Sequence, residues 1–228
     1  MKNRDRIIVA LDLDDAESAL RLAKSVAPVF PFFKIGMKLF TREGPDFVRE
    51  VMKNGQVFLD LKFYDIPTVV AEAVSNAAQL GVSLLTVHAS GGSAMLKHCM
   101  DKLKSSKASC RLLAVTVLTS FDSLQEFGIE HSIAEYVQRL AELAHSSGVD
   151  GIVCSPQELV SLRAHYSSPF LLVTPGIRGA SDFAGDQKRT SSASEALKSG
   201  ADYLVIGRPI IAADDPLTAA EKIAEEIS

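Results

Sequence analysis

Short apolar runs recur along the chain, and each is followed by a segment in which apolar residues repeat with helical spacing. Near-continuous apolar runs are typical of parallel strands whose two faces are both covered. Eight such runs occur: RIIVALD (6–12), FFKIG (32–36), QVFLDLK (56–62), SLLTVHA (83–89), RLLAVTVL (111–118), DGIVCS (150–155), FLLVTPG (170–176) and DYLVIG (202–207). The pattern predicts a β-α unit repeated eight times.

Helix boundaries are marked by residues with a known capping role. An Asp or Ser followed three residues later by Glu is typical of a helix start, and it occurs at Asp14/Glu17, Ser132/Glu135, Ser155/Glu158 and Ser192/Glu195. Proline favours the first helical position, and this predicts helix starts at Pro156 after Ser155 and at Pro216 after Asp215. Glycines that end helices in the left-handed conformation are predicted at Gly55, Gly81, Gly148 and Gly200.

The repeat predicts an α/β fold, a single (β/α)8 TIM barrel in which residues 1–228 form one catalytic domain. An open doubly wound sheet is the alternative, but no GxGxxG or GxxxxGK[ST] motif follows the first strand, and eight repeats favour the barrel. The longest loops are predicted at 119–131 and 174–190. Both follow strands, on the face where the active sites of barrels form.

Composition narrows the class of protein. The chain is 47% hydrophobic and 23% charged, and its net charge of -4 argues against a nucleic-acid partner. Its three cysteines show no paired spacing, so neither a disulfide framework nor a zinc site is expected. The apolar run IIVAL near the N-terminus is too short for a signal peptide, and no segment reaches the roughly 20 apolar residues of a membrane span. We expect a cytoplasmic protein without a membrane partner.

The segment FLDLKFYDIP (58–67) places charges inside an apolar strand. Because side chains alternate along a strand, Asp60 and Lys62 share the face of Phe58, opposite the apolar residues between them. The apolar set suits contact with helices, so both charges are expected to point into the barrel. Asp12 ends the first predicted strand, and Lys34 lies within the second. Four charges are therefore predicted to meet at the carboxyl ends of three adjacent strands.

Two interpretations of this cluster are possible. Buried charges can form an ion-pair network that merely fills the barrel end, but clustering at the catalytic face favours a role in chemistry. A Schiff-base lysine must be neutral, whereas Asp60 and Asp65 favour the ammonium of Lys62, which predicts a proton donor. A divalent metal among the carboxylates is the weaker interpretation, because Lys34 and Lys62 would compete for the same space. Asp65 lies beyond the strand, and its direction cannot be derived from alternation.

The loops after the seventh and eighth predicted strands are suited to phosphate, which barrels commonly bind there. They read TPGIRG (174–179), AGDQKRT (184–190) and VIGRPI (205–210). Arg208 can form paired hydrogen bonds to phosphate, Gly207 permits close approach of the backbone, and Arg178 and Gln187 lie in the preceding loop. Lys188 and Arg189 are read as solvated surface. A cationic pocket on an acidic protein suits a small anionic substrate.

Polar residues also lie near the ends of the fourth and fifth predicted strands. Thr119 and Ser120 after the fifth predicted strand could contact a polar ring edge, and a simple loop cap explains them equally well. His88 ends the fourth strand, and a single histidine there is more often a packed structural residue. We assign it no role.

The chain resembles orotidine 5′-phosphate decarboxylases. FLDLKFYDIP matches the Asp-x-Lys-x-x-Asp signature of that family, and the resemblance extends over the whole chain through ALD, FFKIG, TVHASGG, VTVLTS, TPGIR, AGDQKR and VIGRPI. The resemblance implies a homodimeric (β/α)8 barrel with shared active sites. It also implies conversion of orotidine 5′-monophosphate to UMP and CO2, the last step of de novo pyrimidine nucleotide synthesis, without cofactor or metal.

The resemblance also implies individual roles. Lys62 would protonate C6 of the pyrimidine beside Asp60, with Lys34 and Asp65 completing an alternating array of charges. Asp65 and Thr68 would reach into the partner's site. The substrate contacts implied are ribose hydroxyls for Asp12 and Lys34, the pyrimidine edge for Thr119, and the phosphate side for Arg178, Gln187, Gly207 and Arg208.

Two other functions remain open at this stage. A metal-dependent phosphosugar decarboxylase or aldolase shares the Asp-x-Lys-x-x-Asp pattern. A catalytically silent nucleotide-binding barrel is also conceivable, although buried charges without a task would be costly to keep.

Overall fold

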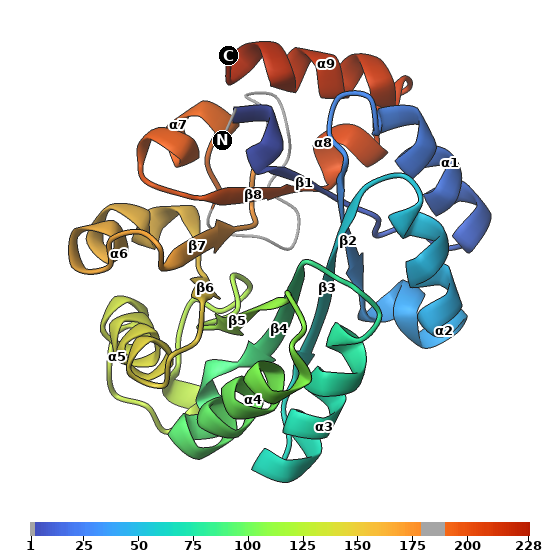
Figure 1. Cartoon of the computed structure of the whole chain (residues 1–228). Helices are drawn as coiled ribbons and strands as arrows, with labels where there is room; N and C mark the ends of the chain where they lie inside the picture. The colour runs from blue at the N-terminus through green and yellow to red at the C-terminus, as the bar shows by residue number, and fades with distance from the viewer. Residues whose placement is uncertain (1–2, 179–189) are drawn as a thin grey trace.

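The computed structural model describes residues 3–178 and 190–228. Its eight parallel strands form a closed barrel in which each strand pairs with the next and β8 pairs with β1 (Figure 1). The strands are β1 (Ile7–Ala10), β2 (Phe32–Gly36), β3 (Gln56–Phe63), β4 (Leu84–His88), β5 (Arg111–Val115), β6 (Gly151–Val153), β7 (Leu171–Thr174) and β8 (Tyr203–Ile206). The predicted barrel is therefore confirmed, and the open sheet is excluded.

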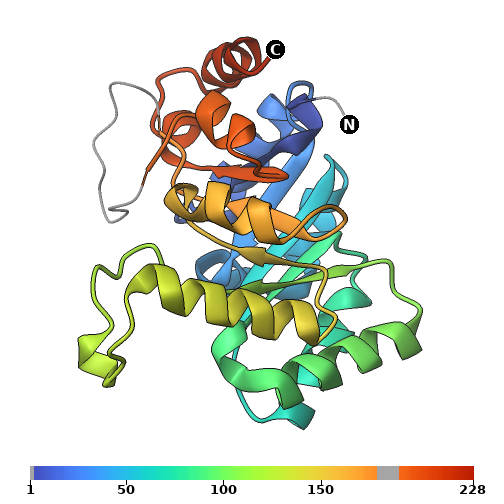
Figure 2. The same cartoon turned by 90° about the vertical axis from the view of Figure 1, so that its left-hand side faces the viewer.

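The helices surround the barrel (Figure 1). They are α1 (Ala16–Val26), α2 (Met37–Met52), α3 (Pro67–Ala78), α4 (Gly92–Ser106), α5 (Ile133–Ser146), α6 (Leu159–His165), α7 (Ala193–Lys198), α8 (Arg208–Ile211) and α9 (Pro216–Glu226). The long loop predicted at 119–131 lies between β5 and α5, whereas most of the loop predicted at 174–190 lies outside the described residues. The segment from β5 to α5 projects from the body of the barrel (Figure 2).

Four of the five predicted helix starts have the predicted capping residue, and at Ser155 the capped element is the short 3-10 helix Pro156–Glu158 that leads into α6. Reciprocal capping boxes form at Ser132/Glu135, Ser155/Glu158 and Ser192/Glu195, and Asp215 caps the helix that starts at Pro216. The prediction for the first helix was wrong by one residue. Asp15, rather than Asp14, accepts the hydrogen bond from the backbone N–H of Ser18.

The glycines predicted to end helices fall into two groups. Gly81, Gly148 and Gly200 have φ of 90°, 77° and 107°, a range that favours glycine. Gly55 has a more extended φ of 158°, and the left-handed prediction was wrong for it. Glycine is needed there because a Cβ would lie 2.2 Å from the carbonyl oxygen of Pro31.

Strand alternation divides the core into two layers. Leu59 and Leu61 of β3 belong to the large shell between strands and helices. Phe58, on the other face, belongs to a smaller cluster inside the barrel, formed by Ile8, Ala10, Phe32, Phe58, Leu84, Leu113, Leu171, Val173, Tyr203 and Val205. The interior is therefore a packed core, as expected for eight strands.

The amino-terminal end of the barrel is closed by polar and aromatic contacts. Inside it, Arg111 donates to the hydroxyl of Tyr203 at 2.9 Å, and the ring of Phe32 meets that of Tyr203 edge-on.

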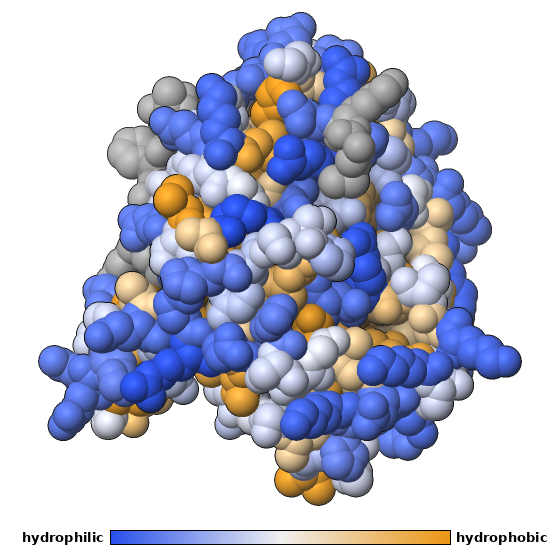
Figure 3. Space-filling view, turned by 60° about the vertical axis from the view of Figure 1, so that its left-hand side comes forward, coloured by the Kyte–Doolittle hydropathy of each residue, from blue (hydrophilic) through white to orange (hydrophobic). Residues whose placement is uncertain are grey.

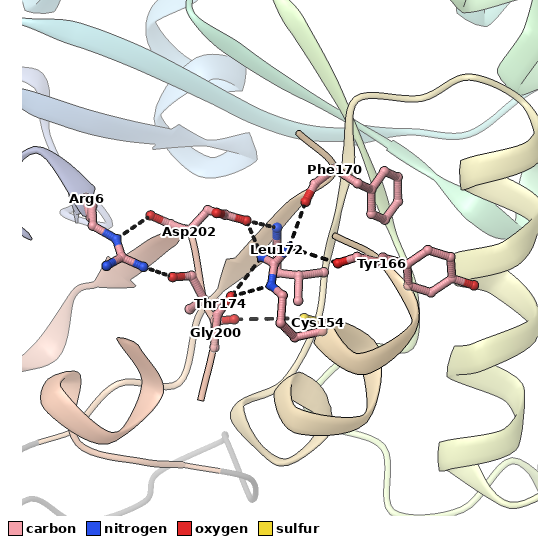
Figure 4. A network of polar contacts seen from close by, with 10 residues as sticks. Arg6, Cys154, Tyr166, Phe170, Leu172, Thr174, Gly200 and Asp202 are labelled. Atoms are coloured by element: carbon pink, nitrogen blue, oxygen red, sulfur yellow. Dashed lines mark hydrogen bonds and ion pairs between the residues drawn. The ribbon is translucent and has the colours of Figure 1, made fainter. Parts of the chain in front are cut away.

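A second network, outside the sheet, joins α6 to the starts of β7 and β8 (Figure 4). The guanidinium of Arg163 pairs with Asp202 and donates to backbone carbonyl groups. These carbonyls belong to Gly200, Tyr166 and Phe170. Asp202 also accepts from the backbone N–H of Leu172 at 2.7 Å. These contacts tie the last third of the chain together at the end opposite the charged cluster.

The three cysteines are free and buried. Burial raises the pKa of Cys99 to about 11 and that of Cys110 to about 12. Thiolate is therefore scarce at neutral pH, and a structural role fits them.

Among the described residues, no helix is long and apolar enough to cross a membrane. Hydrophilic residues cover most of the face in Figure 3, and apolar residues form separate patches on it.

Candidate active site

The carboxyl ends of the strands surround a cavity of about 340 Å³. Charged and polar groups lie around it, and Phe58, Val115, Val117, Leu118 and Val153 supply an apolar wall. Eight of the predicted site residues line this one cavity: Asp12, Lys34, Asp60, Lys62, Thr119, Arg178, Gly207 and Arg208. The structure therefore brings together residues in or just after β1, β2, β3, β5, β7 and β8, while their roles remain predictions.

Four charges alternate in sign along one side of the cavity. Lys34 Nζ lies 2.8 Å from Asp12 Oδ1 and 3.9 Å from Asp60 Oδ2. Asp60 Oδ2 in turn lies 2.6 Å from Lys62 Nζ. The predicted cluster therefore forms as a continuous chain of ion pairs from β1 to β3.

Glycine at the end of β2 leaves room for this chain. A Cβ at Gly36 would lie 3.2 Å from both Asp12 Oδ1 and Lys34 Nζ. A side chain there would crowd the outermost ion pair.

Burial differs along the chain of charges. The side chains of Lys34 and Asp60 are 9% and 13% exposed, whereas that of Asp12 is 54% exposed. The inner pair is therefore shielded from water, where electrostatic interactions are stronger.

Asp60 is ionised in this setting. Burial alone would raise its pKa, but the nearby ammonium groups of Lys62 and Lys34, with hydrogen bonds from Lys62 and Thr86, hold the pKa below its ordinary value of 3.8. Because the folded pKa is depressed, the stability contributed by these contacts is present above the unfolded pKa. It is lost only as pH falls through the lower folded pKa.

The backbone at Lys62 is unusual. Its φ is 50°, a left-handed value that is uncommon for residues other than glycine and costs about 1–2 kcal/mol. The residue lies in an irregular part of β3, where the register against β4 shifts between Leu59 and Phe63. Strand alternation correctly predicted that Asp60 and Lys62 would meet, but it did not predict this bulge.

Thr86 is a site residue that the sequence analysis missed. Its hydroxyl donates to Asp60 Oδ1 at 2.9 Å and accepts from the backbone N–H of Lys62 at 2.9 Å. A signal was available, because alternation in SLLTVHA places a polar residue on the inward face of a strand next to the charged one.

His88 is the last residue of β4, next to the strand that carries Asp60 and Lys62. Burial, and then the charge of Lys62, lowers its pKa, while Asp60 opposes the shift. Its ring meets the ring of Tyr64 edge-on at 6.0 Å between centroids. A packed, neutral histidine agrees with the expectation that assigned it no catalytic role.

Three predicted residues are not in the cavity wall that the structure describes. Asp65 is exposed, and its carboxylate accepts from the backbone N–H of Ile66 at 2.6 Å. Thr68 lines a separate groove between α3 and α4. Gln187 lies outside the described residues.

Large apolar side chains close to Asp65 in the sequence are exposed. Among the described residues, the exposed large apolar side chains are Met37, Tyr64, Ile66, Val69, Phe127 and Val160. Tyr64, Ile66 and Val69 flank Asp65 in sequence. Such a grouping around an exposed carboxylate is typical of a protein contact surface.

Metal binding has little support in the described parts of the chain. They contain no group of three or more His, Cys, Asp or Glu side chains arranged to hold a metal ion. Between Asp12 and Asp60, the ammonium of Lys34 takes the position that a divalent cation would need.

Comparison with known proteins identifies relatives over almost the whole length. Residues 5–223 match the model of the orotidine 5′-phosphate decarboxylase / HUMPS family. Orotidine 5′-phosphate decarboxylase of Saccharophagus degradans is 48% identical, with 98% of this chain and 95% of the relative covered. The enzyme of that name from Trichlorobacter lovleyi is 47% identical, with the same coverage.

A solved structure agrees with these relatives. The crystal structure of orotidine 5′-phosphate decarboxylase from Lactobacillus acidophilus superposes with a TM-score of 0.85 at 38% identity. The superposition covers 98% of this chain and 99% of the other.

Proposed function

The chain belongs to the orotidine 5′-phosphate decarboxylase / HUMPS family, and on this basis we propose that it converts orotidine 5′-monophosphate to UMP and carbon dioxide. This reaction makes it a carboxy-lyase of pyrimidine biosynthesis. The observation that supports the proposal most strongly is the ion-pair chain ending in Lys62, set in a cavity that Arg178 and Arg208 also line. We further propose that residues 1–228 act as one catalytic domain in the cytoplasm.

In the proposed reaction, Lys62 is the proton donor. The bond between C6 and the carboxylate breaks, and its electron pair remains on a carbon with no adjacent electron sink. An ammonium fixed beside that carbon stabilises the developing charge and supplies the proton. Asp60, ionised and 2.6 Å from Lys62 Nζ, pairs with the ammonium and lies against the departing carboxylate.

The remaining cavity residues hold the substrate in this proposal. Asp12 and Lys34 bind ribose hydroxyls, and Thr119 contacts the pyrimidine edge. Arg178, Gly207 and Arg208 bind the phosphate, together with Gln187. Binding energy from the phosphate, remote from the reacting carbon, can then be used to orient the base.

The reaction is proposed to need neither metal nor cofactor. The position of Lys34 between two carboxylates supports this, because the lysine supplies the positive charge that a cation would otherwise bring. The test is to incubate purified, EDTA-treated protein with orotidine 5′-monophosphate and follow loss of substrate. We expect full turnover. Activity that requires added Mg²⁺ would instead favour a metal-dependent phosphosugar enzyme, and tight UMP binding without turnover would favour a silent binding protein.

Arg208 provides a direct test of the phosphate site. We expect Arg208→Ala to raise KM for orotidine 5′-monophosphate by about 10- to 100-fold, since hydrogen bonds to charged groups contribute about 1.5–3 kcal/mol. Binding of uridine, which lacks the phosphate, should not change, and Arg49→Ala on the exposed face of α2 serves as the control. An unchanged KM in the Arg208 variant would exclude this role.

We propose that the protein is a homodimer in which Asp65 and Thr68 enter the partner's site. Asp65 is exposed and does not line the cavity of its own chain, and its neighbours Tyr64, Ile66 and Val69 are exposed apolar side chains, which supports this arrangement. The two residues that one chain does not bring to its own cavity would thereby be used.

Mixing two inactive variants tests the shared site. Lys62→Ala and Asp65→Ala should each have low activity alone. After mixing and subunit exchange, we expect about a quarter of wild-type activity, because half of randomly paired dimers are mixed and each contains one intact site. A mixture no more active than its components, although exchange has been verified by mass spectrometry, would show that the sites are not shared.

A further inference from the structure

The hydroxyl of Thr86 is buried beside apolar residues, where a polar group costs stability unless it is hydrogen-bonded. The residue lies in the middle of β4 and is fully buried, with 0% exposure. Leu84, on the same face of the strand, belongs to the apolar interior cluster. Valine has the same shape and would avoid the cost of burying a polar group.

Both hydrogen bonds of this hydroxyl go to the charged segment of β3. Asp60 is ionised and can only accept, so the Thr86 hydroxyl must donate its single proton to Asp60 Oδ1. A lone pair then accepts from the backbone N–H of Lys62. The directions of both bonds are therefore determined by chemistry.

The two bonds bridge the irregular part of the strand. Leu59 pairs with Leu85, and Phe63 pairs with Val87, so four steps along β3 are matched by two along β4. Between these pairs, the N–H of Lys62 meets a side-chain hydroxyl, and the residue has its left-handed φ of 50°. Thr86 thus fixes the backbone that carries the Lys62 side chain.

The same hydroxyl fixes the rotation of the Asp60 carboxylate. With Oδ1 held by Thr86, Oδ2 is the oxygen that faces Lys62 Nζ at 2.6 Å and Lys34 Nζ at 3.9 Å. One side chain therefore determines the positions of the carboxylate and of the lysine backbone at once.

We propose that Thr86 is a positioning residue, which acts through Asp60 and Lys62 to set where the Lys62 ammonium lies. This inference rests on the function proposed above. The proposed site would thereby include Thr86 of β4, a residue that does not itself line the cavity.

Substitutions at Thr86 separate the hydroxyl from the shape of the side chain. We expect Thr86→Val to lower kcat by about 10- to 100-fold, with KM changed much less, because it removes a hydrogen bond to a charged group. Thr86→Ser, which retains the hydroxyl, should remain within about threefold of wild type. The acidic limb of the kcat profile should move to higher pH in the valine variant alone, because loss of the hydrogen bond raises the pKa of Asp60.

Thr116 offers a matched control. It is also buried, and its hydroxyl donates to the backbone carbonyl of Val153. We expect Thr116→Val to retain wild-type kcat. If the role of Thr86 is purely structural, Thr86→Val will have a lower unfolding temperature, but its kcat, measured on folded protein, will equal that of the wild type. This result would overturn the proposal.

A second measurement does not depend on turnover. Amide hydrogen exchange at Lys62, followed by NMR in the ligand-free protein, should accelerate in Thr86→Val and not in Thr86→Ser. If Thr86→Val does not fold, Thr86→Ala removes the same hydroxyl with a smaller side chain. An unchanged exchange rate at the Lys62 amide of Thr86→Val would overturn the proposal even if orotidine 5′-monophosphate were not the substrate. Wild-type protein that does not turn over orotidine 5′-monophosphate would instead count against the proposed function alone.

Discussion

Replacing Lys62 with alanine is expected to lower kcat for orotidine 5′-monophosphate by about four orders of magnitude or more. Proton donation by a positioned side chain contributes about 10²–10⁴-fold, and stabilisation of developing charge contributes about 10²–10³-fold. Lys62 is proposed to supply both. UMP binding should remain detectable, because the residues proposed to bind phosphate follow β7 and β8, three or four strands from β3 around the barrel.

Two controls make the Lys62 experiment specific. Lys53→Ala removes an exposed lysine that pairs with Glu50 on the surface, and it should leave kcat unchanged. Lys62→Arg retains a positive charge but donates a proton poorly, so it should remain far less active than wild type. Near-normal turnover by Lys62→Ala, with substrate loss followed by absorbance, would exclude this residue as the proton donor.

Replacing Arg163 with alanine is expected to lower the free energy of unfolding by about 3 kcal/mol, at the lower end of the range for breaking a buried ion pair. The value is at the lower end because the side chains of Arg163 and Asp202 are 24% and 26% exposed, so water partly replaces the lost contacts. The variant leaves Asp202 without its guanidinium partner and removes the donor to the carbonyls of Gly200, Tyr166 and Phe170.

Chemical denaturation measures this loss. Arg21→Ala removes an arginine whose ion pair with Glu17 is exposed on α1, and it should change stability by less than about 0.5 kcal/mol. kcat of Arg163→Ala should match wild type at low temperature, because the network lies at the end of the barrel opposite the charged cluster. A loss no larger than that of the Arg21 control would mean that the network contributes little.

The sequence patterns that predicted the fold, namely the apolar runs and the capping pairs, depend on interactions between residues that are close in the sequence. The eight apolar runs all became strands, and three of the four proposed Ser/Asp–Glu pairs became capping boxes. Asp14 failed because Asp15 offers an equivalent side chain one residue closer to the helix. Which of two adjacent aspartates caps the helix depends on the backbone conformation at the helix start, and the sequence pattern does not specify that conformation.

The candidate site was predictable where strand periodicity applied. Asp60 and Lys62 share a face, and the closed barrel brings Asp12 and Lys34 to them. The bulge at Lys62 was not predictable, because it depends on pairing with β4. The direction of Asp65 stays a prediction, since the residue follows the strand and its proposed target lies in another chain.

The network around Arg163 shows a different limit. It joins the side chain of Arg163 to the turn before β8 and to the start of β7. These segments are far apart in the sequence, and no short-range sequence pattern connects them. An arginine on a short helix is usually interpreted as surface charge. Only the closed barrel, which brings these three segments together, shows what it binds.

The arrangement of the cavity bears on how such barrels diversify. The ion-pair chain belongs to β1, β2 and β3, whereas the arginines proposed to bind phosphate follow β7 and β8. If the phosphate role proposed above holds, substitutions in the first group of strands can alter the reaction while the second group keeps its proposed anchor for phosphorylated compounds. Inheritance of an unchanged anchor would let a lineage acquire new chemistry on related substrates through few mutations, without first losing the ability to bind them.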